Sequence, residues 1–228
     1  MSQPSSGDRP ADRLRGSGFL VAGVVALVIV AMAFVVVTLF AFTVFPSAMR
    51  APSIRKGLVQ HPAVGKKFSE LSLTPLLGVD KPATVDDLAG NVVLLDFWGT
   101  WCPHCCLEMP DVVAVGEEFQ DRPDFKLVAV ACASPSESGQ DDVEQLRDDV
   151  QAYLKRSRLS LTMYADPKRV SRAGLDQRGA FRGYPAKILL DRQGVIRAVS
   201  SGADPGDLRG IRRLIVSLLD EPAATPGA

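Results

Sequence analysis

The sequence predicts an α/β domain in which a mixed central sheet is covered by helices on both faces. Two observations carry this prediction. Predominantly apolar runs at 92–97 and 125–131 are typical of strands buried on both sides, and segments with helical spacing of apolar residues follow them. The turn sequence Asp191-Arg192-Gln193-Gly194 joins two further strands as a hairpin, which makes that pair antiparallel. The resulting order β-α-β-α-β-β-α places helices on both sides of one sheet.

Each predicted element rests on its local pattern. Strands are short runs rich in Val, Leu and Phe, and helices place apolar residues three and four positions apart. In chain order we expect a strand over Val92–Phe97, a helix over Cys102–Glu118 that Pro110 can kink, a strand over Phe125–Ala131, a helix over Asp141–Arg156, strands over Leu161–Tyr164, Lys187–Leu190 and Val195–Ser200, and a final helix opened by Asp207.

The predicted domain covers residues 64–220, and the remaining segments differ from it in composition. Residues 1–17 are rich in Ser, Pro, Gly and Arg and are expected to be a disordered tail. Residues 46–63 contain Pro46, Pro52 and Pro62 and are expected to be a linker. Residues 221–228 are expected to be a flexible tail of Pro, Ala and Gly.

An uncharged segment over residues 18–45 is expected to be a transmembrane helix. At about 1.5 Å per residue, its 28 residues reach roughly 42 Å, more than the roughly 30 Å of a bilayer's hydrocarbon core. A cleaved signal peptide is the alternative, because small residues occur at Ser47 and Ala48. The apolar part of a signal peptide usually has only about 7–15 residues, which favours an uncleaved anchor.

Charge excludes some functions and leaves the topology open. The chain has 26 Lys and Arg against 26 Asp and Glu, so nothing indicates nucleic-acid binding, and its four cysteines are too few for a disulfide-stapled scaffold. Arg9, Arg13 and Arg15 precede the apolar segment, and Arg50, Arg55 and Lys56 follow it. Because this is close to a tie under the positive-inside rule, we place the domain outside the cytoplasm on its expected chemistry.

That chemistry is indicated by the pentapeptide Trp101-Cys102-Pro103-His104-Cys105. It follows a buried strand and precedes a helix, so Cys102 is expected at a helix N-terminus, where the backbone N–H groups favour a thiolate. A thiolate is the attacking species in thiol–disulfide exchange. We therefore expect Cys102 to be the nucleophile and Cys105 to be the residue that resolves the mixed disulfide.

Two stretches carry a resemblance to a known family. The first is Val-Val-Leu-Leu-Asp-Phe-Trp-Gly-Thr-Trp-Cys-Pro-His-Cys-Cys-Leu-Glu-Met-Pro at 92–110, and the second is Phe-Arg-Gly-Tyr-Pro-Ala at 181–186. Over about residues 64–220 the chain resembles the thioredoxin superfamily, and within it the membrane-anchored TlpA/ResA-type thiol–disulfide oxidoreductases. The resemblance implies a thioredoxin-like fold, no cofactor, protein thiols and disulfides as substrates, and a membrane or periplasmic redox partner.

The resemblance also implies roles for individual residues. Asp96 would handle protons for the buried cysteine, and Glu108 would assist thiol deprotonation, although a strand-end Asp and a surface Glu are the simpler alternatives. Pro185 would be a cis-proline, with Tyr184 giving backbone contacts to substrate. Trp101 would form part of the substrate groove.

The chain departs from the family at three places. Pro103 and His104 form a Cys-Pro-His-Cys motif similar to that of DsbA, whereas the family usually has proline directly before the second cysteine. A protonated His104 would make the pair more oxidising, so the direction of electron flow stays open between a reductant of the cytochrome c maturation type and a disulfide donor. Ala186 replaces the usual Thr, and Cys106 and Cys132 are extra.

Other hypotheses remain for the cysteines. Cys106 and Cys132 are expected to be small buried residues, with a structural disulfide between them as an alternative. A copper- or zinc-binding module would use Cys102, His104, Cys105 and Cys106 as ligands. A peroxidase on the same fold would need a cysteine supported by Thr and Arg in a different local pattern, which this sequence does not contain.

Overall fold

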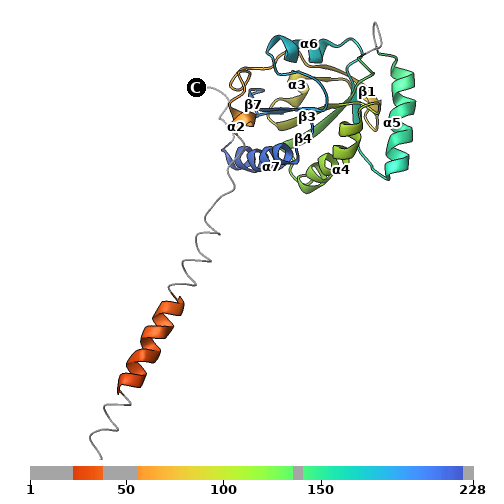
Figure 1. Cartoon of the computed structure of the whole chain (residues 1–228). Coiled ribbons are helices and arrows are strands. Elements are labelled where there is room, and N and C mark those ends of the chain that lie inside the picture. The colour runs from red at the N-terminus through yellow and green to blue at the C-terminus, as the bar shows by residue number, and fades with distance from the viewer. Residues whose placement is uncertain (1–22, 38–55, 136–140, 223–228) are drawn as a thin grey trace, which may run out of the picture. The chain divides into compact units, whose positions relative to one another are not determined.

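The structure is a computed structural model that describes residues 23–37, 56–135 and 141–222, and the chain divides into two compact units at residue 53 (Figure 1). In the first unit, residues 23–37 form a helix. The rest of the predicted span, residues 18–22 and 38–45, lies outside the described residues, as do the predicted tail at 1–17 and residues 223–228 of the predicted tail at 221–228. Among the described residues, no helix combines the length and apolar character needed to cross a membrane.

The second unit contains a seven-stranded mixed sheet in the order β2-β1-β5-β4-β3-β6-β7. β3 is parallel to β4, and β4 is parallel to β5, whereas the other neighbouring pairs are antiparallel. The strands are β1 (Ser72–Leu77), β2 (Ala83–Thr84), β3 (Val92–Trp98), β4 (Phe125–Ala131), β5 (Met163–Ala165), β6 (Ala186–Leu190) and β7 (Ile196–Ser201). The helices are α2 (Lys56–Val59), α3 (Val85–Leu88), α4 (Pro103–Glu118), α5 (Val143–Ser157), α6 (Val170–Gln177) and α7 (Pro205–Asp220).

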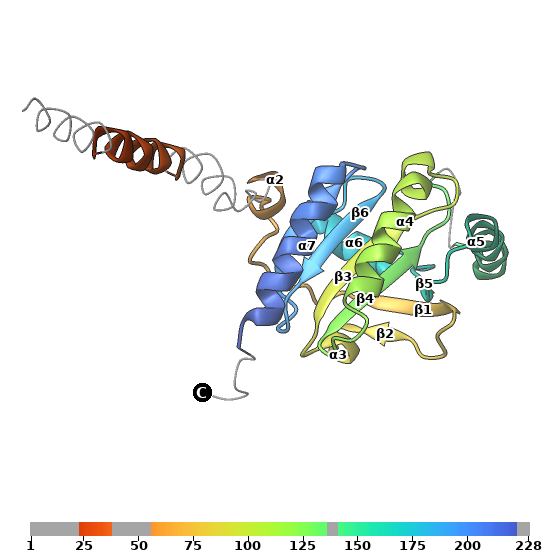
Figure 2. The same cartoon turned by 90° about the horizontal axis from the view of Figure 1, so that it is seen from below.

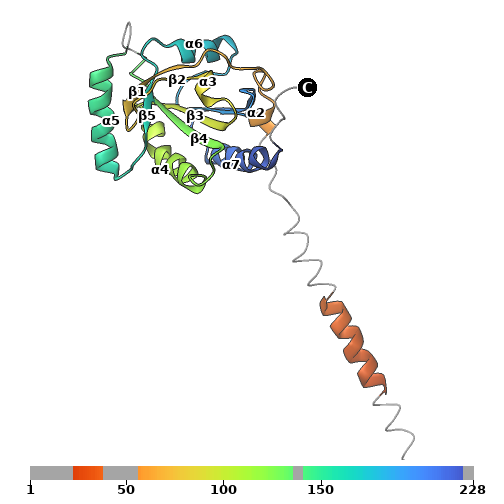
Figure 3. The same cartoon turned by 180° about the vertical axis from the view of Figure 1, so that it is seen from behind.

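Helices cover both faces of the sheet, as the order of elements predicts. α4 and α7 lie on one face and α6 lies on the other (Figures 1 and 3), and Figure 2 shows α4 and α7 side by side. All seven residues of β3 are buried, and alternate residues point to opposite faces. Leu94 packs in the cluster that includes residues of α4 and α7, and Leu95 packs in the cluster that includes Leu175 of α6. The thioredoxin-like α/β prediction is therefore confirmed for this unit.

The predicted strands and helices are present, with shifts at their ends. The predicted strand over Leu161–Tyr164 lies at Met163–Ala165, because Met163 is the first residue that pairs with β4. The final helix begins at Pro205, ahead of Asp207. Asp204 is its N-cap, since the Asp204 carboxylate accepts the Gly206 N–H at 2.8 Å, and a proline suits the first helical position. α4 continues through Pro110.

The predictions omit five short elements, α2, β1, β2, α3 and α6. β1 contains Pro75, which weakens its strand signal, and its alternation is incomplete because β1 lies near the sheet edge. α2 lies within the segment expected to be a linker, yet Leu58 is 1% exposed and packs in the core beside α7. Residues 56–63 thus contribute to the folded unit, which starts before Val64.

Candidate active site

The two motif cysteines form a disulfide at the start of α4. The chain leaves β3 at Trp98, turns through residues 99–101, and enters α4 with Cys102 as the N-cap. The Cys102 sulfur accepts the Cys105 N–H at 3.2 Å, and Pro103 occupies the first helical position, where its missing N–H costs nothing. Cys102 is bonded to Cys105 with 5.3 Å between their Cα atoms. This is the N-terminal position that the sequence predicts for Cys102.

The other motif residues and the two extra cysteines take no part in this bond. Pro103 and His104 are exposed to solvent. The predicted alternative of a Cys106–Cys132 disulfide is wrong, because both thiols are free. Cys106 packs against the core on the α4 face of the sheet, whereas Cys132 is buried on the α6 face. Burial raises the pKa of Cys132 to about 12, so this thiol stays protonated at neutral pH.

A buried cluster of three charged residues, here called the lysine cluster, lies on the α4 side of the sheet. It consists of Asp96 on β3, Glu108 on α4 and Lys187 on β6, which are 1%, 8% and 1% exposed. The Lys187 ammonium donates to Glu108 Oε2 at 2.6 Å and lies 3.6 Å from Asp96 Oδ1. Asp96 Oδ1 has no hydrogen-bond partner among the described residues. The simpler alternative of a surface Glu108 is therefore wrong.

Burial controls the protonation of both carboxyl groups in the lysine cluster. It raises the pKa of Asp96, and the charge of Lys187 offsets only part of this effect. The pKa of Glu108 is raised for the same reason, with Lys187 again opposing and the charge of Asp96 adding to the rise. Glu108 follows Cys105 by three residues on one helix, so its side chain lies on the same face as the sulfur. Both carboxyl groups therefore have raised pKa values on the α4 side of the sheet.

Lys187 is a site residue that the predictions miss. Its sequence signal is a lysine within the apolar strand β6, two residues after Pro185. Such a lysine normally indicates an edge strand or a strand end. The role of Lys187 in the site follows only from the strand register. In this register Lys187 pairs directly with Asp96 across the antiparallel β3–β6 ladder.

Two aromatic residues lie beside the redox pair. The Tyr184–Pro185 peptide bond is cis, as predicted. The Tyr184 ring meets the Trp101 ring edge-on, with 5.0 Å between centroids, and the Trp101 indole N–H donates to the Cys132 carbonyl oxygen at 2.9 Å. Trp101 is 38% exposed, so its free face can contact another chain.

The metal-site alternative finds no geometric support in the part of the chain that the structure describes. No three His, Cys, Asp or Glu side chains gather there in an arrangement that could hold a metal ion. Cys102 and Cys105 are joined to each other, and His104 is exposed.

Comparisons with known proteins agree with this geometry. Residues 64–199 match the model of the AhpC/TSA family. The thioredoxin-like protein YneN of Bacillus subtilis is 30% identical over 138 residues, which cover 60% of this chain and 71% of that protein. The thiol:disulfide interchange protein DsbE of Pseudomonas aeruginosa is 29% identical over 163 residues, covering 71% of this chain and 80% of DsbE.

A solved structure supports the fold. The thioredoxin-family thiol:disulfide interchange protein of Chlorobium tepidum superposes with a TM-score of 0.52 at 22% identity, covering 67% of this chain and 95% of that one. The fold, the Cys102–Cys105 disulfide and these relatives agree with one another. The chain belongs to the AhpC/TSA family and is a thiol–disulfide oxidoreductase with a thioredoxin-like fold.

Proposed function

We propose that this oxidoreductase acts on protein substrates outside the cytoplasm, tethered to a membrane by residues 18–45, and that it works as a reductant. The observation that carries the proposal is the Cys102–Cys105 disulfide at the first turn of α4, next to the exposed Trp101. The uncharged segment at 18–45 supports the tether. Substrate disulfides are common outside the cytoplasm and rare within it, which supports the location.

The reaction is a two-step exchange. In the reduced enzyme, the Cys102 thiolate attacks one sulfur of a substrate disulfide, forming a mixed disulfide and releasing one substrate thiolate. The Cys105 thiolate then attacks the Cys102 sulfur, which restores the Cys102–Cys105 disulfide and releases the second substrate thiolate. The substrate gains two electrons and the enzyme loses two, so a redox partner must reduce the enzyme again.

The lysine cluster supplies proton transfer in the second step. Cys105 is 2% exposed, so solvent has little access to its thiol. A carboxyl group whose pKa is raised toward neutrality can take the proton from that thiol and return it. Asp96 and Glu108 have this property, and Lys187 stabilises whichever of them is ionised.

The same cluster favours the reductant direction. Positive charge near the pair stabilises a thiolate and makes the disulfide more oxidising. With one of its two carboxyl groups protonated the lysine cluster is neutral, and ionisation of the second carboxyl group gives it a negative charge that disfavours a thiolate at Cys105. His104 would have the opposite effect, but it is exposed, and water and salt screen its charge.

The reduction potential tests the direction. We expect the full chain, purified in detergent and equilibrated with thiol–disulfide buffers, to give a value near thioredoxin's roughly −270 mV. A value near the roughly −120 mV of DsbA would make the protein a disulfide donor and overturn this part of the proposal. Glu108→Gln should raise the potential by more than His104→Ala lowers it, because only Glu108 is buried.

Trapping experiments test the roles of the cysteines. Cys105→Ser leaves Cys102 free to attack but removes the resolving thiol, so we expect mixed disulfides with substrate proteins to accumulate. Cys102→Ser should trap none, and Cys106→Ser, the control, should behave as the wild type. Peroxide turnover that survives in Cys102→Ser would favour a peroxidase instead.

Labelling tests the location. A cysteine introduced near Asp220, in a variant that lacks the half-buried free thiol of Cys106, should react with a membrane-impermeant maleimide in intact cells from which any outer envelope has been removed. Protection of that cysteine until the cells are lysed would place the domain in the cytoplasm.

A further inference from the structure

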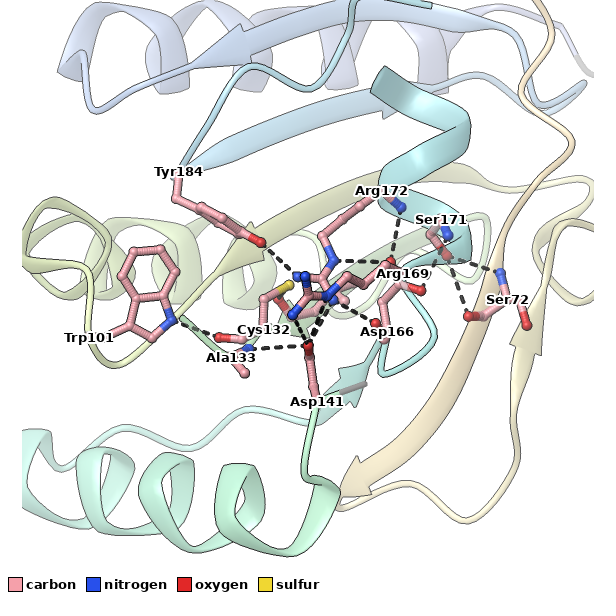
Figure 4. Close-up of polar contacts among 11 residues, drawn as sticks. Ser72, Trp101, Cys132, Ala133, Asp141, Asp166, Arg169, Ser171, Arg172 and Tyr184 are labelled. Carbon is pink, nitrogen blue, oxygen red and sulfur yellow. Dashed lines mark hydrogen bonds and ion pairs between the residues drawn. The ribbon is translucent and has the colours of Figure 1, made fainter. Parts of the chain in front are cut away.

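Arg172 on α6 is a buried side chain with an extensive set of hydrogen bonds, although it lies outside the motifs. It is 6% exposed. Its guanidinium donates four hydrogen bonds, to Asp166 Oδ2 at 3.2 Å, the Asp166 carbonyl at 2.6 Å, Asp141 Oδ2 at 2.7 Å and the Tyr184 hydroxyl at 2.8 Å (Figure 4). Arg172, Asp141 and Asp166 are called the arginine cluster below.

The contacts of the arginine cluster lead from Tyr184 to the other aromatic residue of the site. Asp141 Oδ2 accepts the Ala133 N–H at 3.2 Å. Ala133 follows Cys132, whose carbonyl oxygen accepts the indole N–H of Trp101. Because the rings of Trp101 and Tyr184 touch, these contacts form a closed loop (Figure 4).

This loop holds two residues that flank the chemistry. Trp101 directly precedes Cys102, and Tyr184 directly precedes Pro185. Tyr184 also lines a surface cavity of about 520 Å³, together with Phe181, Arg182 and Arg172. A protein substrate that brings its disulfide to Cys102 therefore comes close to this aromatic pair.

The arginine cluster has the physical properties needed to hold the Tyr184 side chain in one position. A guanidinium is planar and always charged, and two buried carboxylates hold it in one orientation. Asp141 is further bonded by Arg169, with 3.2 Å between Arg169 Nη2 and Asp141 Oδ1. Burial raises the pKa of Tyr184, so the phenol stays neutral and accepts the hydrogen bond from Arg172.

We propose that Arg172 is a positioning residue that holds Tyr184, and through Asp141 and residues 132–133 also Trp101, in the geometry that binds protein substrates. This inference rests on the proposed exchange with protein substrates. It assigns Arg172 an effect on substrate binding, and no direct contact with the reacting sulfur atoms.

The test compares a large substrate with a small one. The full chain is reduced in detergent, and its single-turnover reaction with insulin disulfides gives a half-saturating concentration and a limiting rate. The oxidised chain is separately reduced by dithiothreitol, which is too small to need the aromatic pair. The variants are Tyr184→Phe, which removes one hydroxyl group, and Arg172→Lys, which keeps the charge but loses the fork of donors.

We expect Tyr184→Phe and Arg172→Lys each to raise the half-saturating insulin concentration about tenfold, the loss expected for one hydrogen bond to a charged group. The rate of reduction by dithiothreitol should change by a much smaller factor than the half-saturating insulin concentration does. Tyr164→Phe on β5, outside the cluster, is the matched control and should behave as the wild type. The half-saturating insulin concentration of the double variant should exceed that of Arg172→Lys by no more than about twofold, because both substitutions break the same hydrogen bond between Arg172 and Tyr184.

Other outcomes overturn the inference. Unchanged insulin binding in Tyr184→Phe would do so, as would effects of Tyr184→Phe and Arg172→Lys that multiply in the double variant. A parallel fall of the insulin and dithiothreitol rates would show that the cluster acts on the disulfide itself. If Arg172→Lys does not fold, Tyr184→Phe decides alone.

Failure of the proposed function gives a different result. If the wild type does not reduce insulin, the reductant direction fails. The same variants are then compared as oxidants of reduced, unfolded ribonuclease A, and a shift in that half-saturating concentration decides the role of Arg172.

Discussion

The lysine cluster and the arginine cluster lie on opposite faces of the same sheet, and each combines two buried carboxyl groups with one basic residue. They differ in how completely their charges are bonded. Within the described parts of the chain, Lys187 donates one hydrogen bond and Asp96 Oδ1 accepts none, whereas Arg172 donates four. Asp166 also accepts the backbone N–H groups of Ser171 and Arg172.

The difference indicates separate tasks. Burial raises the pKa of Asp96, Glu108 and Asp166 alike, so burial by itself does not separate the clusters. An incompletely bonded carboxyl can change its protonation without breaking a network, which suits proton transfer at Cys105. A fully bonded cluster resists any change, which suits the positioning of Tyr184.

Replacing each basic residue by methionine should expose this difference. Arg172→Met leaves Asp141 and Asp166 buried without their shared partner, so we expect a loss of about 3–5 kcal/mol in the free energy of unfolding at pH 7. Urea denaturation measures it. Arg212→Met, which breaks a surface pair with Glu118, is the control and should cost less than about 1 kcal/mol. A loss of unfolding free energy in Arg172→Met that is smaller than the loss in Arg212→Met would contradict the role of the arginine cluster as a support.

Lys187→Met should have a smaller effect. Only one hydrogen bond is lost, and Asp96 or Glu108 can take up a proton, so we expect a loss of about 1.5–3 kcal/mol at pH 7. The same urea titrations measure the loss. A cost equal to that of Arg172→Met would remove the distinction between the clusters.

Gly99→Ala should disturb the loop at Trp101. An added Cβ would lie 2.3 Å from Trp101 Nε1 and 2.8 Å from the Cys132 carbonyl oxygen, so the indole must move. We expect a loss of about 1–3 kcal/mol, the usual cost of overpacking, and a shift in tryptophan fluorescence. Gly116→Ala is the matched control, because its Cβ would meet only the movable end of Leu127. Unchanged fluorescence in Gly99→Ala would contradict the predicted displacement.

Asp96→Asn should change how stability depends on pH. The pKa of Asp96 is raised above its ordinary value of 3.8, so the folded state binds the proton more tightly than the unfolded state. Wild-type stability from this group is therefore present below pH 3.8 and lost as pH rises through the raised pKa. We expect Asp96→Asn to gain stability relative to the wild type over that range, as measured by denaturation between pH 4 and 8.

Glu70 should contribute to the pH dependence of stability with the opposite sign to Asp96. The side-chain hydrogen bond from Arg178 lowers the pKa of Glu70, so its contribution is present at neutral pH and lost as pH falls. Glu70→Gln should therefore lose stability relative to the wild type as pH rises. A slope of the same sign in both variants would show that Asp96 is not the group that titrates.

The sequence by itself determined the features that depend on neighbours along the chain. The apolar runs of β3 and β4, the helix that follows Cys102, and the cysteine spacing each have a local signal, because a strand, a helix start and a four-residue disulfide involve only nearby residues. The short elements β1 and α6 were missed, since their stability comes from packing against the sheet and little from their own pattern.

Only the tertiary structure decided which charges meet. Glu108 and Lys187 are 79 residues apart and Asp141 and Arg172 are 31 apart, yet each pair is in hydrogen-bond contact. A strand has the same local pattern whichever neighbour it pairs with, and a shift of one residue would turn Lys187 to the opposite face of the sheet. The register of β3 with β6 therefore places Lys187 beside Asp96, and the packing of α6 places Arg172 beside Tyr184.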